Sequence, residues 1–121
     1  MLKRRILIVD DEEGIRESFK LILADSYSLI FAMSGPDAME KVNKEAFDLV
    51  LLDIKMPKMN GLDLLKEIKK ARPGLPVMIV TGYQSVEMAQ EAIRNGAADY
   101  IPKPFEPKQI QDAVKNTIKI D

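Results

Sequence analysis

The sequence has 121 residues and a mass of 13.6 kDa, a length that fits one domain of ordinary size. Hydrophobic residues make up 46% of the chain and charged residues 31%, so it can bury a core, and 18 basic against 19 acidic residues give a net charge of −1. This balance provides no global positive field for direct nucleic-acid binding, and the absence of cysteine and histidine excludes disulfides, thiolate nucleophiles and imidazole general bases. No apolar run approaches the roughly 20 residues that span a bilayer, and the basic N-terminal start is too short for a signal peptide, so we predict a cytoplasmic protein without a membrane contact.

Short apolar runs alternate with amphipathic stretches from one end of the chain to the other. Three runs rich in Val, Ile and Leu are typical of strands that are covered on both faces of a parallel sheet, and two more mixed runs suit strands nearer the edges. In chain order, the five predicted strands are 6–9, 28–32, 49–52, 77–80 and 99–101.

Apolar residues recur at helical spacing between and after these runs. Arg72-Pro73-Gly74 is expected to end the third helix, and Asn95-Gly96 the fourth. Right-handed crossovers then place helices on both faces of one parallel sheet, and ligands of such sheets bind outside the carboxyl ends of the strands. The residues predicted to form the helical stripes are Ile15, Phe19, Ile22 and Leu23; Ala38, Val42 and Ala46; Leu62, Leu65, Ile68 and Lys69; Val86, Ala89, Ala92 and Ile93; and Ile110, Ala113, Val114 and Ile118.

Polar side chains with reactive chemistry follow four of the five predicted strands. Because the carboxyl ends of parallel strands meet at one edge, these side chains are expected to converge on one cleft. In strand order they are Asp10 and Asp11, Asp53, Thr81 and Lys103.

Each acid also has a purely structural alternative. Asp10 and Asp11, helped by Glu12 and Glu13, could cap the first helix and complement its macrodipole. Asp53 could simply begin a loop. The convergence of acids, a hydroxyl and an amine on one edge favours the functional interpretation.

The chemistry of such a cleft can be predicted from its side chains. Clustered carboxylates repel each other, so a hard divalent cation with oxygen ligands is expected, namely Mg²⁺ with Mn²⁺ as an alternative. Mg²⁺ keeps room for waters and phosphate oxygens, so a phosphoryl group is its expected companion. With histidine and cysteine absent, a carboxylate is the expected nucleophile and would form an aspartyl phosphate. Asp53 is best placed, because it stands between the other acids and the pair Thr81 and Lys103.

Four stretches of the sequence carry specific motifs: ILIVDD at 6–11, DLVLLDIKMP at 48–57 followed by Asn60-Gly61, VTG at 80–82 and DYIPKPF at 99–105. Together they resemble the receiver domain of bacterial two-component response regulators, over nearly all of the chain. The resemblance implies one receiver domain over residues 1–121. It also implies a doubly wound α/β fold of the flavodoxin-like type, (βα)5, with a five-stranded parallel sheet in the order 2-1-3-4-5.

The resemblance further implies that Asp53 accepts a phosphoryl group from a sensor histidine kinase, so the chain would be a signalling phosphoacceptor rather than a metabolic enzyme. Asp11 and Asp53, with Asp10 largely through water, would hold Mg²⁺, and the backbone carbonyl of Lys55 would complete the protein ligands.

The resemblance also implies a switch. Thr81 would hydrogen-bond the phosphoryl group and Lys103 would pair with it, aimed into the site by a cis bond before Pro104. Thr81 and Tyr100 would move inward on phosphorylation and change the face formed by the fourth helix, fifth strand and fifth helix, which would contact an output domain or a partner. Tyr100 has the alternative of being only a half-buried strand aromatic.

Several neighbours of these residues have two interpretations. Pro57 and Gly61 are expected to make the turn after the third strand. Gly82 is either a turn residue or, as the resemblance implies, a small residue that leaves the phosphoryl group accessible. Five residues are predicted to line the rim, either as solvated side chains or as tuners of dephosphorylation and kinase choice: Lys55, Met56, Lys58, Met59 and Tyr83.

Other functions fit the sequence less well. A phosphatase of the haloacid dehalogenase type usually carries Asp-x-Asp after its first strand, where this chain has Asp10-Asp11-Glu12. A pseudo-receiver, which keeps the fold without phosphorylation, would usually lack one of the five key residues. Nucleotide binding is disfavoured because no glycine-rich phosphate loop follows the first strand.

The stretch 81–105 is similar to receivers of the nitrogen-regulatory (sigma-54) transcription activator class. That similarity predicts an ATPase and a DNA-binding part after Asp121, and a phosphorylation-dependent homodimer through the fourth and fifth helices. A stand-alone receiver fits the sequence equally well.

Overall fold

Five parallel strands form one sheet in the order β2-β1-β3-β4-β5 in the computed structural model, which describes residues 3–57, 59–83 and 85–118. The predicted strands agree with the observed ones to within one residue at each end, and the sheet order and the fold class are confirmed. The strands are β1 (Arg5–Val9), β2 (Ser28–Ala32), β3 (Leu49–Leu52), β4 (Val77–Thr81) and β5 (Asp99–Pro102).

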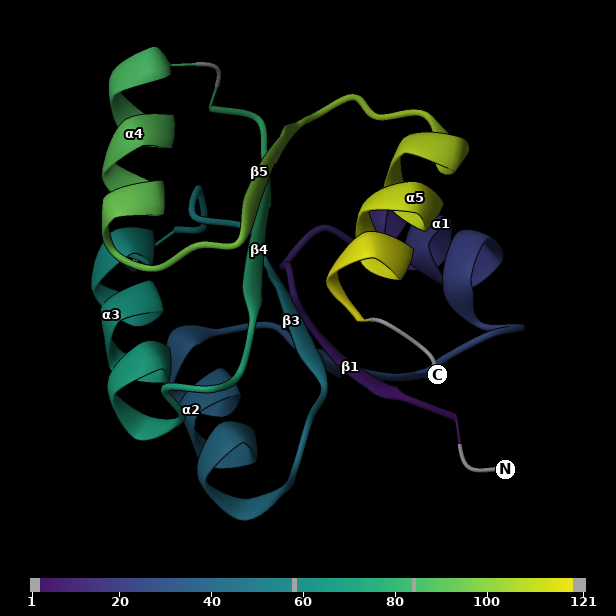
Figure 1. The fold of residues 1–121 in the computed structure, drawn as a ribbon, viewed down its shortest axis with the longest axis horizontal. Coiled ribbons are helices and arrows are strands. Elements are labelled where there is room, and N and C mark those ends of the chain that lie inside the picture. The colour runs from purple at the N-terminus through teal and green to yellow at the C-terminus, as the bar shows by residue number, and fades with distance from the viewer. Residues whose placement is uncertain (1–2, 58, 84, 119–121) are drawn as a thin grey trace.

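Helices cover both faces of this sheet, with α1 and α5 on one face and α2, α3 and α4 on the other (Figure 1). Alternate strand residues point to opposite faces, so Ile6 and Ile8 pack towards α1 and α5, whereas Leu7 and Val9 pack towards the other three helices. Both faces of the sheet are therefore buried, which explains why the strand sequences are continuous apolar runs. The helices are α1 (Glu13–Leu23), α2 (Gly35–Lys44), α3 (Gly61–Ala71), α4 (Val86–Arg94) and α5 (Pro107–Thr117).

The predicted helix ends are confirmed. Helix α3 stops at Ala71, just before Arg72-Pro73-Gly74, and α4 stops at Arg94, just before Asn95 and Gly96. Gly96 has φ +100°, in the left-handed region that glycine tolerates, so its backbone can leave the helix without strain. None of the helices in the described ranges is both long and apolar enough to cross a membrane.

Three predicted stripe positions are wrong. Ala46 lies beyond the end of α2 and is exposed, because that helix stops at Lys44. Val86 and Ile93 on α4 are 73% and 49% exposed. Helix α4 lies beside α3 at the β5 edge of the sheet and packs through Ala92 and Met88, so Val86 and Ile93 fall on its outward side.

Gly61 begins α3 directly against the loop that follows β3. A Cβ on Gly61 would fall against the Cα and Cβ of Ile54 and 2.5 Å from the Ile54 carbonyl oxygen, so only glycine fits. Gly61 was predicted to make the turn after β3; it lies instead at the start of α3, where this close approach holds the loop next to Asp53. A Cβ on Gly82, by contrast, would have nothing within 4 Å.

Candidate functional site

The predicted site residues meet at the carboxyl edge of the sheet because backbone pairing continues past the strand ends. The Asp53 N–H donates to the Val9 carbonyl at 3.0 Å, which sets Asp53 beside the chain that leaves β1 at Asp10. The Lys103 N–H donates to the Thr81 carbonyl at 2.8 Å, which sets the end of β5 beside the end of β4. Four loops thus carry their functional side chains into one place.

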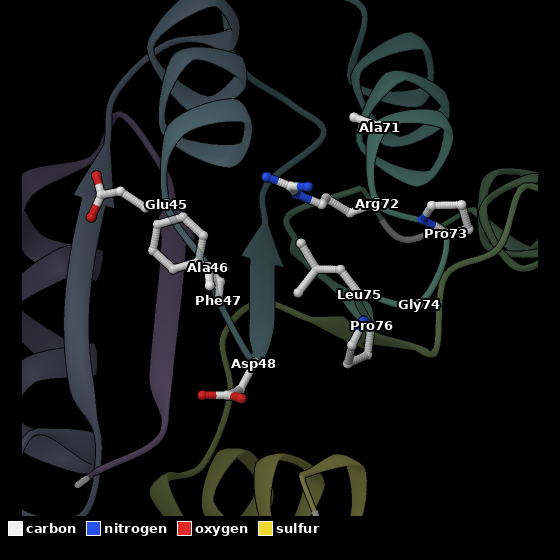
Figure 2. Close-up of a pocket in the computed structure, with 10 residues that line it drawn as sticks. All are labelled: Glu45, Ala46, Phe47, Asp48, Ala71, Arg72, Pro73, Gly74, Leu75 and Pro76. Atoms are coloured by element: carbon white, nitrogen blue, oxygen red, sulfur yellow. The ribbon is translucent and has the colours of Figure 1, made fainter.

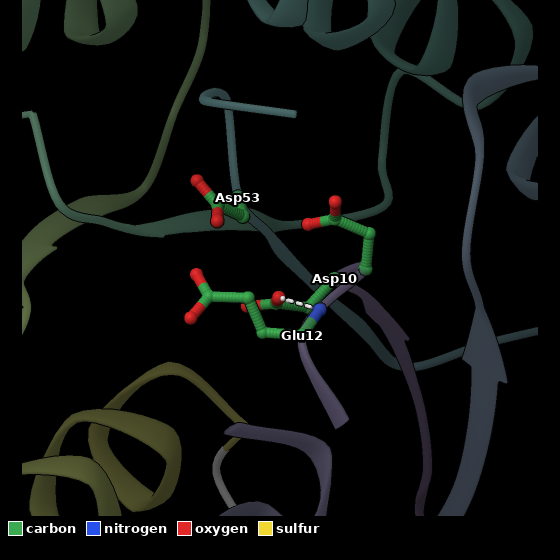
Figure 3. Close-up of side chains that lie close together, drawn as sticks. Asp10, Glu12 and Asp53 are labelled. Carbon is green, nitrogen blue, oxygen red and sulfur yellow. Dashed lines mark hydrogen bonds between the residues drawn. The ribbon is translucent and has the colours of Figure 1, made fainter. Parts of the chain in front are cut away.

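A cluster of four carboxylates lies at this edge. One carboxylate oxygen from each of Asp10, Asp11, Glu12 and Asp53 lies within 4.8 Å of the others. Asp10 and Asp53 are each only 2% exposed, whereas Asp11 and Glu12 are exposed. Figure 3 shows Asp10, Glu12 and Asp53 pointing towards one another. The predicted meeting of Asp10, Asp11 and Asp53 is confirmed.

Glu12 was not predicted to belong to this cluster. Its one expected role was to help cap the first helix, in the structural alternative; Glu12 is indeed the N-cap residue of α1, but its side chain makes no capping hydrogen bond. Instead, the Glu12 N–H donates to Asp10 Oδ1 at 2.9 Å, which folds the acidic loop back on itself. The place of Glu12 as the third consecutive acid after a buried strand was the feature of the sequence that could have predicted this.

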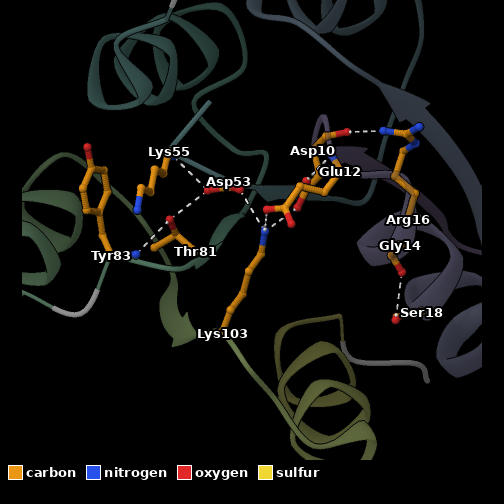
Figure 4. Close-up of polar contacts among 10 residues, drawn as sticks. All are labelled: Asp10, Glu12, Gly14, Arg16, Ser18, Asp53, Lys55, Thr81, Tyr83 and Lys103. Atoms are coloured by element: carbon orange, nitrogen blue, oxygen red, sulfur yellow. Dashed lines mark hydrogen bonds and ion pairs between the residues drawn. The ribbon is translucent and has the colours of Figure 1, made fainter. Parts of the chain in front are cut away.

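The Lys103 ammonium stands among these carboxylates (Figure 4). Its Nζ lies 2.9 Å from Asp10 Oδ2, 2.9 Å from Asp53 Oδ2 and 3.1 Å from Glu12 Oε1, and its side chain is 10% exposed. Burial opposes the charge, but hydrogen bonds to Asp53 and Asp10 outweigh it and raise the pKa of Lys103. Burial also raises the pKa of Asp10, against the Glu12 N–H and Lys103, which lower it.

Both oxygens of the Asp53 carboxylate are held in place. Oδ1 accepts the Lys55 N–H at 2.8 Å and the Thr81 hydroxyl at 2.8 Å, and Oδ2 accepts the Lys103 ammonium at 2.9 Å. Thr81 is completely buried, so its hydroxyl is fixed by its surroundings. The acid is oriented by a cation, a hydroxyl and a backbone amide, and each of these donors favours added negative charge.

A chain of contacts links Asp53 to Tyr100. The Tyr83 N–H donates to Thr81 Oγ1 at 3.4 Å, and the Tyr100 hydroxyl donates to the Tyr83 carbonyl at 2.7 Å. Burial raises the pKa of Tyr100, and the charges of Asp53 and Tyr83 add to this. Tyr100 is half-buried, as its alternative interpretation required, and it is also connected to the site.

The predicted rim is partly correct. Lys55 is exposed, with its Nζ 5.2 Å from the ring centre of Tyr83, and Met59 is half-buried. Met56 is wrong as a rim residue, because it is 6% exposed and packs in the core on the side of α2, α3 and α4. Lys58 lies outside the described residues. The Lys103–Pro104 peptide bond is cis, as predicted.

The donor set of the cluster fits Mg²⁺. Mg²⁺ prefers hard oxygen ligands, binds through few carboxylates and keeps several waters. Asp11 and Glu12 face solvent, while Asp10 and Asp53 are buried behind them, so the cluster offers carboxylates on one side and water on the other. Asp10 and Asp53 already bind one cationic group, the Lys103 ammonium.

A separate hollow of about 590 Å³ lies at the opposite edge of the sheet, at the amino ends of β3 and β4 (Figure 2). Residues 45–48 and 71–76 line it, and none of them is a predicted site residue. This hollow therefore lies apart from the predicted site residues. The converging donors and carboxylates place the candidate site at the carboxyl edge.

A protein family and a solved structure both match nearly the whole chain. Residues 6–115 match the response regulator receiver domain family. The chain is similar to the response regulator receiver domain protein (CheY-like) from Methanospirillum hungatei JF-1, whose crystal structure superimposes with a TM-score of 0.91 at 38% identity, covering 96% of this chain and 94% of that one.

Two curated relatives differ in length. The transcriptional regulatory protein ZraR of Escherichia coli (strain K12) is 40% identical over 114 residues, which cover 93% of this chain but only 26% of ZraR. The sporulation initiation phosphotransferase F of Bacillus subtilis (strain 168) is 39% identical over 121 residues, which cover 99% of this chain and 98% of that protein. The chain thus spans about a quarter of one relative and nearly all of the other.

Proposed function

The chain belongs to the response regulator receiver domain family, whose members are phosphorylation switches in signalling rather than metabolic enzymes, and from this premise we propose that Asp53 is the phosphoryl acceptor. The contacts of Asp53 carry the proposal. The Lys55 N–H, the Thr81 hydroxyl and the Lys103 ammonium all reach its carboxylate at 2.8 to 2.9 Å. Donors held in these positions stabilise the negative charge that a phosphoryl group brings.

In the proposed reaction, a carboxylate oxygen of Asp53 attacks the phosphorus of a phosphohistidine on a sensor kinase. The new O–P bond forms as the N–P bond breaks, and the kinase histidine keeps the electron pair and takes up a proton. Mg²⁺, or Mn²⁺ in its place, neutralises charge on the phosphoryl oxygens when it is bound. Asp11 and Asp53, with Asp10 through water, would hold the ion together with the backbone carbonyl of Lys55.

Two residues of the proposed site act on the phosphoryl group itself. Lys103 stays charged because of its raised pKa, so it can pair with a phosphoryl oxygen after leaving one of its carboxylate partners. The Thr81 hydroxyl, now donated to Asp53, would be donated to the phosphoryl group instead. Both residues would then bind the new group with side chains that already point at Asp53.

Removal of the metal ion tests this proposal. Incubation with acetyl phosphate and Mg²⁺ should add one phosphoryl group to the protein, read by intact-protein mass, and excess chelator should prevent the addition because the carboxylate cluster repels an anionic donor. Adduct formation that does not depend on a divalent ion would contradict the proposed role of the cluster. Mg²⁺ binding without an adduct from any small donor or kinase would favour the pseudo-receiver alternative.

The phosphatase alternative is tested with a different class of substrate. It requires repeated turnover of small phosphate esters, with more phosphate released than protein present. Turnover that Asp10→Asn abolishes and Asp53→Asn preserves would support it. We expect stoichiometric modification of Asp53 instead, because the Thr81 hydroxyl and the Lys55 N–H reach Asp53, whereas Asp10 shares only the Lys103 ammonium with it.

We also propose that phosphorylation changes the face formed by α4, β5 and α5. The support is the contact chain from Asp53 through Thr81 and Tyr83 to Tyr100, which leads from the acceptor to β5. A phosphate adds about −1.5 to −2 charges and three acceptor oxygens, enough to draw the Thr81 hydroxyl from Asp53 Oδ1 onto a phosphoryl oxygen and disturb the contacts behind it. Tyr100 would turn inward as part of this change.

Beryllofluoride, a mimic of the phosphoryl group, tests the change of this face. Its addition with Mg²⁺ should shift backbone amide signals of α4, β5 and α5 in NMR spectra, while those of α2 stay as the internal reference. Sedimentation on the same samples would detect a phosphorylation-dependent homodimer. Unchanged amide signals in α4 and α5 would contradict the proposed output face.

The wider context of the chain is also part of the proposal. Residues 1–121 would form one receiver domain that works in the cytoplasm with a sensor histidine kinase, without direct contact to nucleic acid or membrane. The similarity to ZraR supports an output part of a transcription regulator, whereas the similarity to phosphotransferase F supports a receiver that passes its signal to another protein. In either context Asp53 would be the phosphoryl acceptor of this chain.

A further inference from the structure

Two aromatic rings tie the loop that carries Lys103 to helix α1. Phe105 lies between β5 and α5, and its ring stacks on that of Phe19, with 5.3 Å between the ring centres and 20° between the planes. Phe19 is 1% exposed and belongs to the core on the side of α1 and α5, and Phe105 packs against the same core. The stack is thus a fixed point for the loop after β5.

The backbone of Lys103 is held on two sides, by this stack and by a hydrogen bond to β4. Its own N–H donates to the Thr81 carbonyl at 2.8 Å, and Phe105 follows two residues later. A lysine side chain is a point charge on a flexible stem, so its position depends on where its backbone is held. The Nζ of Lys103 must meet Asp10 and Asp53, which come from two other loops, at 2.9 Å each.

Helix α1 also holds the acidic loop. Its Arg16 guanidinium donates to the Asp10 carbonyl at 3.0 Å, one turn before Phe19 meets Phe105. The same short helix therefore contacts the loop with the carboxylates and the loop with the ammonium. Helix α1 therefore links these two loops.

We propose that Phe105 is a positioning residue for phosphoryl transfer, which acts through its stack on Phe19 to hold the Lys103 ammonium at Asp53. This inference rests on the proposed function. Phe105 itself does not touch the reacting atoms. Its loss lets the Lys103 loop shift, and displacement of a reacting group by about 1 Å can cost roughly 100-fold in rate.

The test measures the rate of adduct formation from acetyl phosphate at saturating Mg²⁺, together with the Mg²⁺ dissociation constant. Phe105→Ala should lower the rate by roughly 10- to 100-fold without weakening Mg²⁺ binding, because the Mg²⁺ ligands lie on other loops and a displaced ammonium repels the ion less. Phe105→Tyr keeps the stacked ring and should keep the rate. Phe47→Ala is the matched control: Phe47 is also half-buried and packed on a core, but it lines the hollow at the opposite edge.

A double-mutant cycle separates positioning from general loosening of the fold. If Phe105 acts through Lys103, then Phe105→Ala should cost little further rate in a Lys103→Met background. Equal rate losses in both backgrounds, or a Phe105→Ala rate equal to that of the wild type, would overturn the inference. If Phe105→Ala is unfolded, Phe105→Leu takes its place in both backgrounds. Failure of the wild type to form any adduct would instead overturn the proposed function.

Discussion

Asp53→Asn is expected to abolish the phosphoryl adduct completely, in the presence of Mg²⁺ and with either acetyl phosphate or a kinase as donor. An amide is not a nucleophile under these conditions, and it also removes the charge that faces Lys103. The fold should survive, because asparagine has nearly the same shape and its oxygen can still accept the Lys55 N–H and the Thr81 hydroxyl. Intact-protein mass gives the yield of adduct, and circular dichroism checks the fold.

Asp48→Asn is the matched control for this experiment. Asp48 precedes β3, whereas Asp53 follows it, and the Asp48 carboxylate also accepts a backbone N–H, that of Arg5, at 2.8 Å. Asp48→Asn should therefore be phosphorylated like the wild type. A single adduct that persists in Asp53→Asn would mean that another carboxylate is the acceptor. Asp10→Asn and Asp11→Asn would then identify it.

The sequence was most informative where burial dictates residue type. The residues of β3 and β4 are buried on both faces, so they read as unbroken apolar runs and their ends were placed to within one residue. The site was predictable for the same reason, because polar side chains immediately after such runs must lie at the edge of the sheet. The close approach of Gly61 to Ile54 shows how a single glycine after β3 then fixes the loop beside the acceptor.

The sequence predictions failed where tertiary packing determines which way a side chain points. Val86 and Ile93 have helical spacing, but whether the apolar side of α4 faces the sheet depends on where that helix lies, and spacing alone does not give this. Glu12 was assigned to the helix because acids favour a first turn, whereas its side chain reaches Lys103, which is distant in sequence. Met56 was placed at the rim by its nearness to Asp53 along the chain, although the loop turns its side chain into the core.

Lys103→Met is expected to slow phosphorylation by roughly 100- to 1000-fold, the usual cost of losing one donor that stabilises developing charge. The same change should tighten Mg²⁺ binding, since the ammonium now lies 2.9 Å from both Asp10 and Asp53 and repels a second cation there. Opposite effects on rate and metal affinity cannot arise from partial unfolding, which would weaken both. Lys108→Met, in which a lysine with an 83% exposed side chain is replaced, should change neither.

Stability should respond to Mg²⁺ in the same variant. Without Lys103, the buried carboxylates of Asp10 and Asp53 lose the ammonium that lies 2.9 Å from each of them, and breaking such a buried pair costs about 3–5 kcal/mol of the free energy of unfolding. Mg²⁺ binds the folded protein and should restore most of this loss, so urea unfolding of Lys103→Met should depend far more steeply on Mg²⁺ than that of the wild type. Equal dependence in the two proteins would show that Lys103 and the metal ion do not neutralise the same carboxylates, and would contradict the proposed arrangement of the site.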